Sequence, residues 1–118
     1  SLDVAQWLSG QIAQIDGLEL VSKGDTIPVF AWKLKAGHSE NWNLYDLSDR
    51  LRMKGWLVPA YPMADDLADL TVQRIVVRAG LSHDLARALI ADIRTEVDFL
   101  NRLESPMPRE GDGSHFHH

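Results

Sequence analysis

The segment that follows Ser82 constrains the fold more than any other part of this sequence. Ser82 carries the short hydroxyl side chain that commonly caps a helix, and Leu81 precedes it as a hydrophobic staple. Apolar residues then recur at helical spacing: Leu85, Leu89, Ile93, Val97, Leu100 and Leu103. This stripe predicts one long amphipathic helix, which must bury a single face against a second layer of structure.

Two further helices are predicted earlier in the chain. The first starts at Asp3, which can cap it, and ends at Gly17. Its apolar stripe consists of Val4, Leu8, Ile12 and Ile15. The second is capped by Asn43, spans residues 44–54 and ends at Gly55.

Strands are predicted between these helices. Alternating or β-branched runs occupy residues 18–22, 27–35, 56–59 and 70–78, and the first two runs read as a hairpin. In the second run, Phe30, Trp32 and Leu34 share the face expected against the helices. The order of elements predicts an α+β fold, a two-layer sandwich whose small, largely antiparallel sheet carries helices on one face.

The length and composition fit one folded domain with a short appendage. The chain has 118 residues, of which 45% are hydrophobic and 25% charged, as in ordinary globular proteins. Residues 1–104 are expected to form the domain. Residues 105–118 contain two prolines and two glycines without a period, so we expect a flexible tail there.

Charge and cysteine content exclude several functions. Twelve basic against seventeen acidic residues give a net charge of −5, which disfavours nucleic acid as a partner. The absence of cysteine removes disulfides and thiolate chemistry and fits a reducing compartment, so a cytoplasmic location is the default expectation. The longest apolar run, residues 57–63, is too short to span a membrane.

Motifs for common catalytic chemistries are missing from the sequence. No serine lies in a GxSxG context, and neither GxGxxG nor GxxxxGK[ST] occurs. Asp46 and Asp49 share a helix face at i,i+3 spacing, but Arg50 and Arg52 adjoin them. A solvated ion-pair face is therefore favoured over an acid–base pair.

Three of the five histidines crowd the end of the chain. His115, His117 and His118 could hold a transition metal by residue type, but a metal site needs ligands on rigid elements, which this tail does not offer. A truncated purification tag is an alternative interpretation, although Phe116 interrupts the run. We therefore predict no resident metal.

Arg74 is the most informative single residue. It places a fixed cation inside the apolar run from Val72 to Val77. An arginine there either faces solvent on the open side of a half-buried sheet or offers a carboxylate-binding guanidinium at the rim of a cleft. The residues alone leave both interpretations open. The four tryptophans favour core or docking positions over a ligand site.

Three stretches together resemble a known family. Residues 44–61, LYDLSDRLRMKGWLVPAY, closely resemble the C-terminal small domain of glutamate decarboxylase. Residues 28–35, PVFAWKLK, are similar to the family's preceding strand, and residues 72–80, VQRIVVRAG, to its later strand. The resemblance covers about residues 11–103.

The resemblance implies an enzymatic context. Glutamate decarboxylases use pyridoxal phosphate to convert L-glutamate to γ-aminobutyrate and carbon dioxide, on the type I fold of pyridoxal-phosphate enzymes, and are expected to form homo-oligomers. Their large domain brings a Schiff-base lysine in a Ser-x-His-Lys context, and no lysine here follows a histidine. This chain alone is therefore expected to bind no cofactor and to be inactive without the missing large domain.

Two site residues follow from the resemblance. Arg74, in the context Val-Gln-Arg-Ile, is similar to the arginine that pairs with the substrate carboxylate. The ending Phe116-His117-His118 is similar to the Phe-x-His-Thr ending of bacterial members, which makes His118 the candidate for closing the active site near neutral pH. Nothing similar to the calmodulin-binding segment of plant members follows Leu103, so calmodulin is not implied. The alternative is a non-catalytic α+β module for ligand sensing or interaction.

Overall fold

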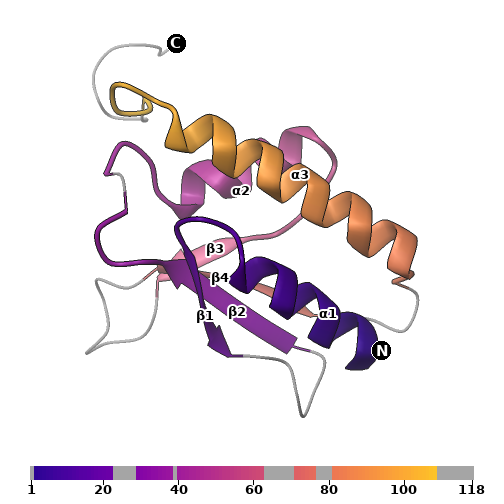
Figure 1. Ribbon diagram of the computed structural model, residues 1–118. Coiled ribbons are helices and arrows are strands. Elements are labelled where there is room, and N and C mark those ends of the chain that lie inside the picture. Colours follow the sequence, from indigo (N-terminus) through magenta and orange to yellow (C-terminus); the bar gives the residue numbers. More distant parts are fainter. Residues whose placement is uncertain (1, 23–28, 39, 63–70, 77–80, 109–118) are drawn as a thin grey trace.

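The residues that the structure describes form three helices and four strands. The computed structural model describes residues 2–22, 29–38, 40–62, 71–76 and 81–108. Its elements, in chain order, are α1 (Leu2–Ala13), β1 (Leu18–Ser22), β2 (Val29–Leu34), α2 (Leu44–Met53), β3 (Ala60–Pro62), β4 (Thr71–Val76) and α3 (His83–Asn101). Figure 1 shows the three helices stacked on one side of the sheet. The predicted two-layer α+β fold is confirmed.

The four strands form one fully antiparallel sheet in the order β1-β2-β4-β3. The predicted hairpin of the first two strands is confirmed, with Leu20 opposite Trp32 and a bulge between Leu20 and Ser22. β4 is an inner strand, which pairs with β2 on one side and with the three-residue edge strand β3 on the other.

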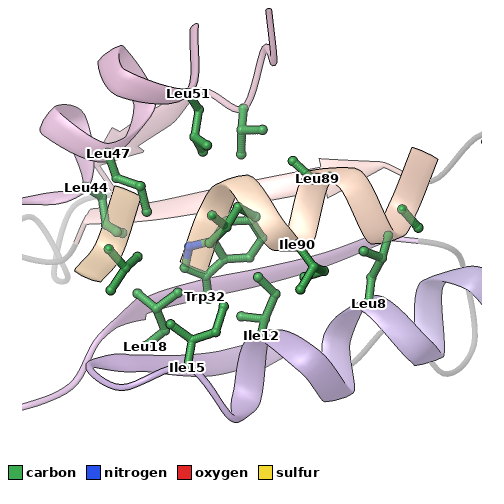
Figure 2. Close-up of a cluster of buried hydrophobic side chains, with 14 of the residues drawn as sticks. Leu8, Ile12, Ile15, Leu18, Trp32, Leu44, Leu47, Leu51, Leu89 and Ile90 are labelled. Carbon is green, nitrogen blue, oxygen red and sulfur yellow. The ribbon is translucent and has the colours of Figure 1, made fainter. Parts of the chain in front are cut away.

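The core lies between the sheet and the helices, with Trp32 at its centre. The Trp32 side chain is fully buried and points from β2 toward the helical layer, where leucines and isoleucines of all three helices surround it (Figure 2). The predicted stripe of α1 is buried, and so are Leu89, Ile93, Val97 and Leu100 of α3. Two residues of the predicted stripe differ: Leu85 is 48% exposed in the first turn of α3, and Leu103 lies beyond the end of the helix, partly buried against the core.

Capping residues fix the ends of α2 and α3 as the sequence predicts. Asn43 and Asp46 form a capping box, in which each side chain accepts a hydrogen bond from the other residue's backbone N–H. Gly55 ends α2 at a φ of 92°, which allows the N–H groups of residues 55 and 56 to satisfy the last carbonyls of the helix. Ser82 caps α3 through Leu85 N–H.

Two predicted boundaries are wrong. α1 begins at Leu2, so Asp3 lies within its first turn, and it ends at Ala13 before a run of turns that leads to Gly17. The predicted strand at residues 56–59 does not form. Val58 is buried as a strand residue would be, but its carbonyl accepts a hydrogen bond from the side chain of Gln73, and Pro59 has no N–H to donate. The edge strand β3 begins at Ala60, directly after the predicted segment ends.

A charged cluster joins α2 to α3 beside this core. Glu96 carries a charge, yet it lies on the buried side of α3 and is only 3% exposed. Its carboxylate accepts a hydrogen bond from Arg50 Nε and pairs with Lys54 Nζ at 2.8 Å. Asp92, one turn earlier, pairs with Lys54 at 3.5 Å and accepts from Trp56 Nε1 at 2.7 Å. The buried carboxylate is therefore compensated by two cations, as a buried charge requires.

The cluster gives the fold a defined sensitivity to acid. Burial works to raise the pKa of Glu96, but the hydrogen bonds and charges of Lys54 and Arg50 outweigh burial and hold this pKa below its ordinary value. A lowered folded-state pKa contributes stability above the ordinary glutamate value of about 4.3. That contribution is lost as the pH falls through the lowered value.

We expect Glu96→Gln to lower the free energy of unfolding near neutral pH, because Arg50 and Lys54 then lose a charged partner. The difference between wild type and variant should narrow below about pH 4.3, since acid removes the same charge from the wild type. Urea unfolding at a series of pH values measures this difference. A constant difference across the series would show that the charge of Glu96 is not what stabilises the contact.

The end of α3 is tied to the loop before α2. Trp42 Nε1 donates to Asn101 Oδ1 at 3.0 Å, and Asn41 Nδ2 donates to the Leu103 carbonyl at 3.0 Å. Met107, inside the segment predicted as a tail, donates its N–H to the Asn41 carbonyl at 2.9 Å and packs against the core. The first residues of that segment thus contact the domain, while the division between 1–104 and 105–118 stays a prediction.

Candidate functional site: the outer face of the sheet

The side chains of neighbouring residues of β4 point to opposite faces of the sheet. Gln73 points into the core, where it is fully buried, accepts from Trp32 Nε1 at 3.1 Å and donates to the Val58 carbonyl at 2.9 Å. Arg74 comes next and points to the face without helices, where it is exposed. The inward contacts of Gln73 fix the backbone from which Arg74 projects.

The surroundings of Arg74 leave its guanidinium available. Its Cζ lies 5.4 Å from the centre of the Tyr61 ring, which is within the range of a cation–π contact. Among the described residues, no carboxylate lies within ion-pair distance of Arg74. Val72 lies on the same face of the sheet but is only 2% exposed. This face is therefore covered at Val72 and open to solvent at Arg74.

This arrangement can bind a carboxylate. A guanidinium stays charged at all relevant pH values and presents paired N–H donors that match the two oxygens of a carboxylate. Four other described arginines, in contrast, already pair with an acid: Arg50, Arg52, Arg87 and Arg102. Both interpretations of Arg74 left open by the sequence agree with its exposure, and its role in binding stays a prediction.

The acidic pair on α2 has structural partners. Asp46 belongs to the capping box, and Asp49 pairs with Arg52 Nη2 at 2.8 Å on the exposed surface. The predicted solvated ion pair therefore holds for Asp49 and Arg52, whereas Asp46 is buried as part of the cap and Arg50 pairs with Glu96 instead. Trp32 and Trp42 are buried in the core, as predicted for tryptophans of this domain.

Two hollows lined by described residues lie on the helical side of the domain. One, of about 270 Å³, lies between the end of α1 and α3 and includes Asp16, Arg94 and Asn101. The other, of about 340 Å³, lies over the end of α3 near Phe99. In the second hollow, Asp98 and Arg102 form an ion pair at 3.1 Å.

The remaining sequence candidates fall outside the described part of the chain. His118, the candidate for active-site closure, lies there, as do His115 and His117 of the predicted metal alternative. Among the residues that are described, no three His, Asp or Glu side chains gather as metal ligands. No helix in the described ranges is long and apolar enough to cross a membrane.

Three residues around the site and core were not predicted from the sequence. Glu96 had a visible signal, because it falls on the apolar stripe of α3 between Ile93 and Leu100, where a charge needs a partner. Gln73 had a weaker one, as an amide within a β-branched run. Tyr61 had none, since its contact with Arg74 depends on the pairing of β3 with β4.

Comparison with known proteins gives one consistent result. No protein-family model matches the chain. Glutamate decarboxylase beta of Listeria monocytogenes is 40% identical over 99 residues, which cover 84% of this chain and 21% of that protein. The glutamate decarboxylase of Aliivibrio fischeri is 42% identical over 98 residues, covering 82% of this chain and 21% of its own length.

A solved structure agrees with these relatives. Glutamate decarboxylase of Lactobacillus brevis superposes with a TM-score of 0.81 at 38% identity, over 87% of this chain and 23% of that one. The chain thus spans only about a fifth of the length of the proteins it matches. The resemblance seen in residues 44–61 is confirmed: in sequence and in fold, this chain matches the C-terminal portion of the glutamate decarboxylases.

Proposed function

We propose that this chain forms the C-terminal portion of a glutamate decarboxylase, which converts L-glutamate to γ-aminobutyrate and carbon dioxide. The observation that carries the proposal is the match to proteins of that name at about 40% identity, together with the shared fold. The exposed guanidinium of Arg74 on the outer sheet face agrees with it.

In this proposal Arg74 binds and orients a carboxylate of the substrate. The guanidinium supplies a fixed charge and two directed N–H donors, so it fixes both the position and the plane of the carboxylate. Its neighbour across the strand pair is Ala31, which has a short side chain.

The proposal places no pyridoxal phosphate on the described residues. Of the described lysines, Lys54 is held by Glu96 and Asp92, and Lys33 and Lys35 line neither of the two hollows described above. The proposal therefore assigns the cofactor, and the electron sink it provides, to a large domain outside this chain. It follows that the 118-residue chain alone should release no carbon dioxide. A homo-oligomeric, cytoplasmic enzyme is part of the same proposal, in keeping with the absence of cysteine.

The gene region upstream of the Ser1 codon provides the test. We expect it to encode a Ser-x-His-Lys segment, and the polypeptide expressed with that region to show cofactor absorbance and to release carbon dioxide from L-glutamate. An unrelated upstream domain, or a complete polypeptide without decarboxylase activity, would refute the proposal and favour a non-catalytic module.

We further propose that His118 closes the active site as the pH rises. An unperturbed histidine loses its charge near pH 6.5, so a neutral His118 would enter the site above that pH and a protonated one would leave it. Deleting residues 116–118 from the complete enzyme should extend activity to higher pH and leave the acidic limb of the profile in place. An unchanged pH–rate profile would rule out this role.

A further inference from the structure

Tyr61 lies where it can control the orientation of Arg74. It is the middle residue of β3 and pairs with Val72, two residues before Arg74 on β4. Antiparallel neighbours at this diagonal offset face the same side of the sheet and lie within reach of aromatic and long side chains. The result is the 5.4 Å separation between the Tyr61 ring centre and the Arg74 Cζ.

The ring, and not the hydroxyl, makes this contact. Within the described ranges, the Tyr61 hydroxyl has no hydrogen-bond partner. The face of an aromatic ring attracts a cation through its quadrupole, and phenylalanine offers the same attraction. A role of the ring would therefore survive the loss of the hydroxyl.

The backbone under Tyr61 is held by the core. β3 is short, but the residue before Tyr61 pairs with Gln73, whose side chain also donates to the Val58 carbonyl at 2.9 Å. Val58 is itself buried. The same buried amide thus anchors the segment that carries Tyr61 and the strand that carries Arg74, so their separation is set by the fold.

We propose that Tyr61 is a positioning residue for the carboxylate-binding guanidinium, an inference that rests on the proposed function of Arg74. A free arginine side chain loses rotamer freedom when it binds a ligand. A ring that already restricts the guanidinium reduces this loss, so the carboxylate binds more tightly. Tyr61 itself does not touch the reacting atoms in this scheme.

The first test concerns the contact and uses the full 118-residue chain. In Tyr61→Phe, the Arg74 Nε–Hε resonance should keep its ring-current shift, and in Tyr61→Leu that shift should disappear. Nuclear magnetic resonance of the chain in neutral buffer measures both. If Tyr61→Leu leaves the resonance in place, the ring does not hold the guanidinium and the inference is wrong.

The second test concerns binding and uses the complete enzyme. Tyr61→Leu should raise the KM for L-glutamate about two- to fivefold, the range for an exposed cation–π contact, with kcat little changed. Tyr61→Phe should behave as wild type. If Tyr61→Leu and Tyr61→Phe have equal KM values while Arg74→Ala is impaired, the inference fails and the proposed function stands. If Arg74→Ala is unimpaired, the proposed role of Arg74 fails.

Discussion

Replacing Arg74 with alanine in the complete enzyme should lower kcat/KM for L-glutamate about 10- to 100-fold, the range expected when one charge-assisted pair of hydrogen bonds is lost. The side chain is exposed and unpaired with any described acid, so the fold does not need it. The thermal midpoint should therefore stay within about 2 °C of wild type, as for other exposed substitutions.

Two variants sharpen the Arg74 measurement. Arg74→Lys keeps a charge but loses the paired donors, so it should recover only part of the activity. Arg87→Ala removes another exposed arginine, one that pairs with Asp84 in the first turn of α3, and should leave kcat/KM unchanged. Equal kcat/KM values for Arg74→Ala and Arg87→Ala would show that Arg74 does not bind the substrate.

Periodicity predicted the elements that bury one continuous stripe. α3 follows from Ser82 and the apolar spacing after it, because a cap and a 3.6-residue period act locally and need no partner to be recognised. The inward position of Trp32 follows in the same way from the two-residue period of β2. These features depend on neighbours in sequence, so the sequence is sufficient to predict them.

The predicted strand at residues 56–59 failed for a reason that is not local. Val58 is as buried as a strand residue would be, but its carbonyl accepts a hydrogen bond from the side chain of Gln73, fifteen positions later in the sequence. An apolar run reports that a segment is buried and does not report which groups satisfy its backbone. The edge strand therefore began later than the pattern indicated.

The same distinction between local and non-local information applies to the candidate site. Arg74 stood out because a cation inside an apolar strand is rare, and the resemblance to a known family gave it a role. Tyr61 did not stand out, since its ring reaches Arg74 only through the register of β3 on β4. Residue type identifies the group that can bind, whereas the fold determines the group that orients it.

Gln73→Leu should destabilise the chain by about 2–4 kcal/mol, the cost of two lost hydrogen bonds that leave buried polar groups behind. Gln73 is fully buried and serves both Trp32 Nε1 and the Val58 carbonyl, and a leucine of similar size can serve neither. Urea unfolding of the 118-residue chain measures the change. Gln6→Leu, an exposed glutamine on α1, is the matched control and should shift stability by less than about 0.5 kcal/mol.

A double variant separates the hydrogen bonds from the packing. Trp32→Phe removes the Nε1 donor, so in the Gln73→Leu background it eliminates one of the two groups left without its former partner. The two substitutions together should therefore cost less than the sum of their separate effects, by about 1 kcal/mol or more. Additive effects would mean that the hydrogen bond from Trp32 Nε1 to Gln73 contributes little to stability, and the cost of Gln73→Leu would then lie in the bond to the Val58 carbonyl and in the packing.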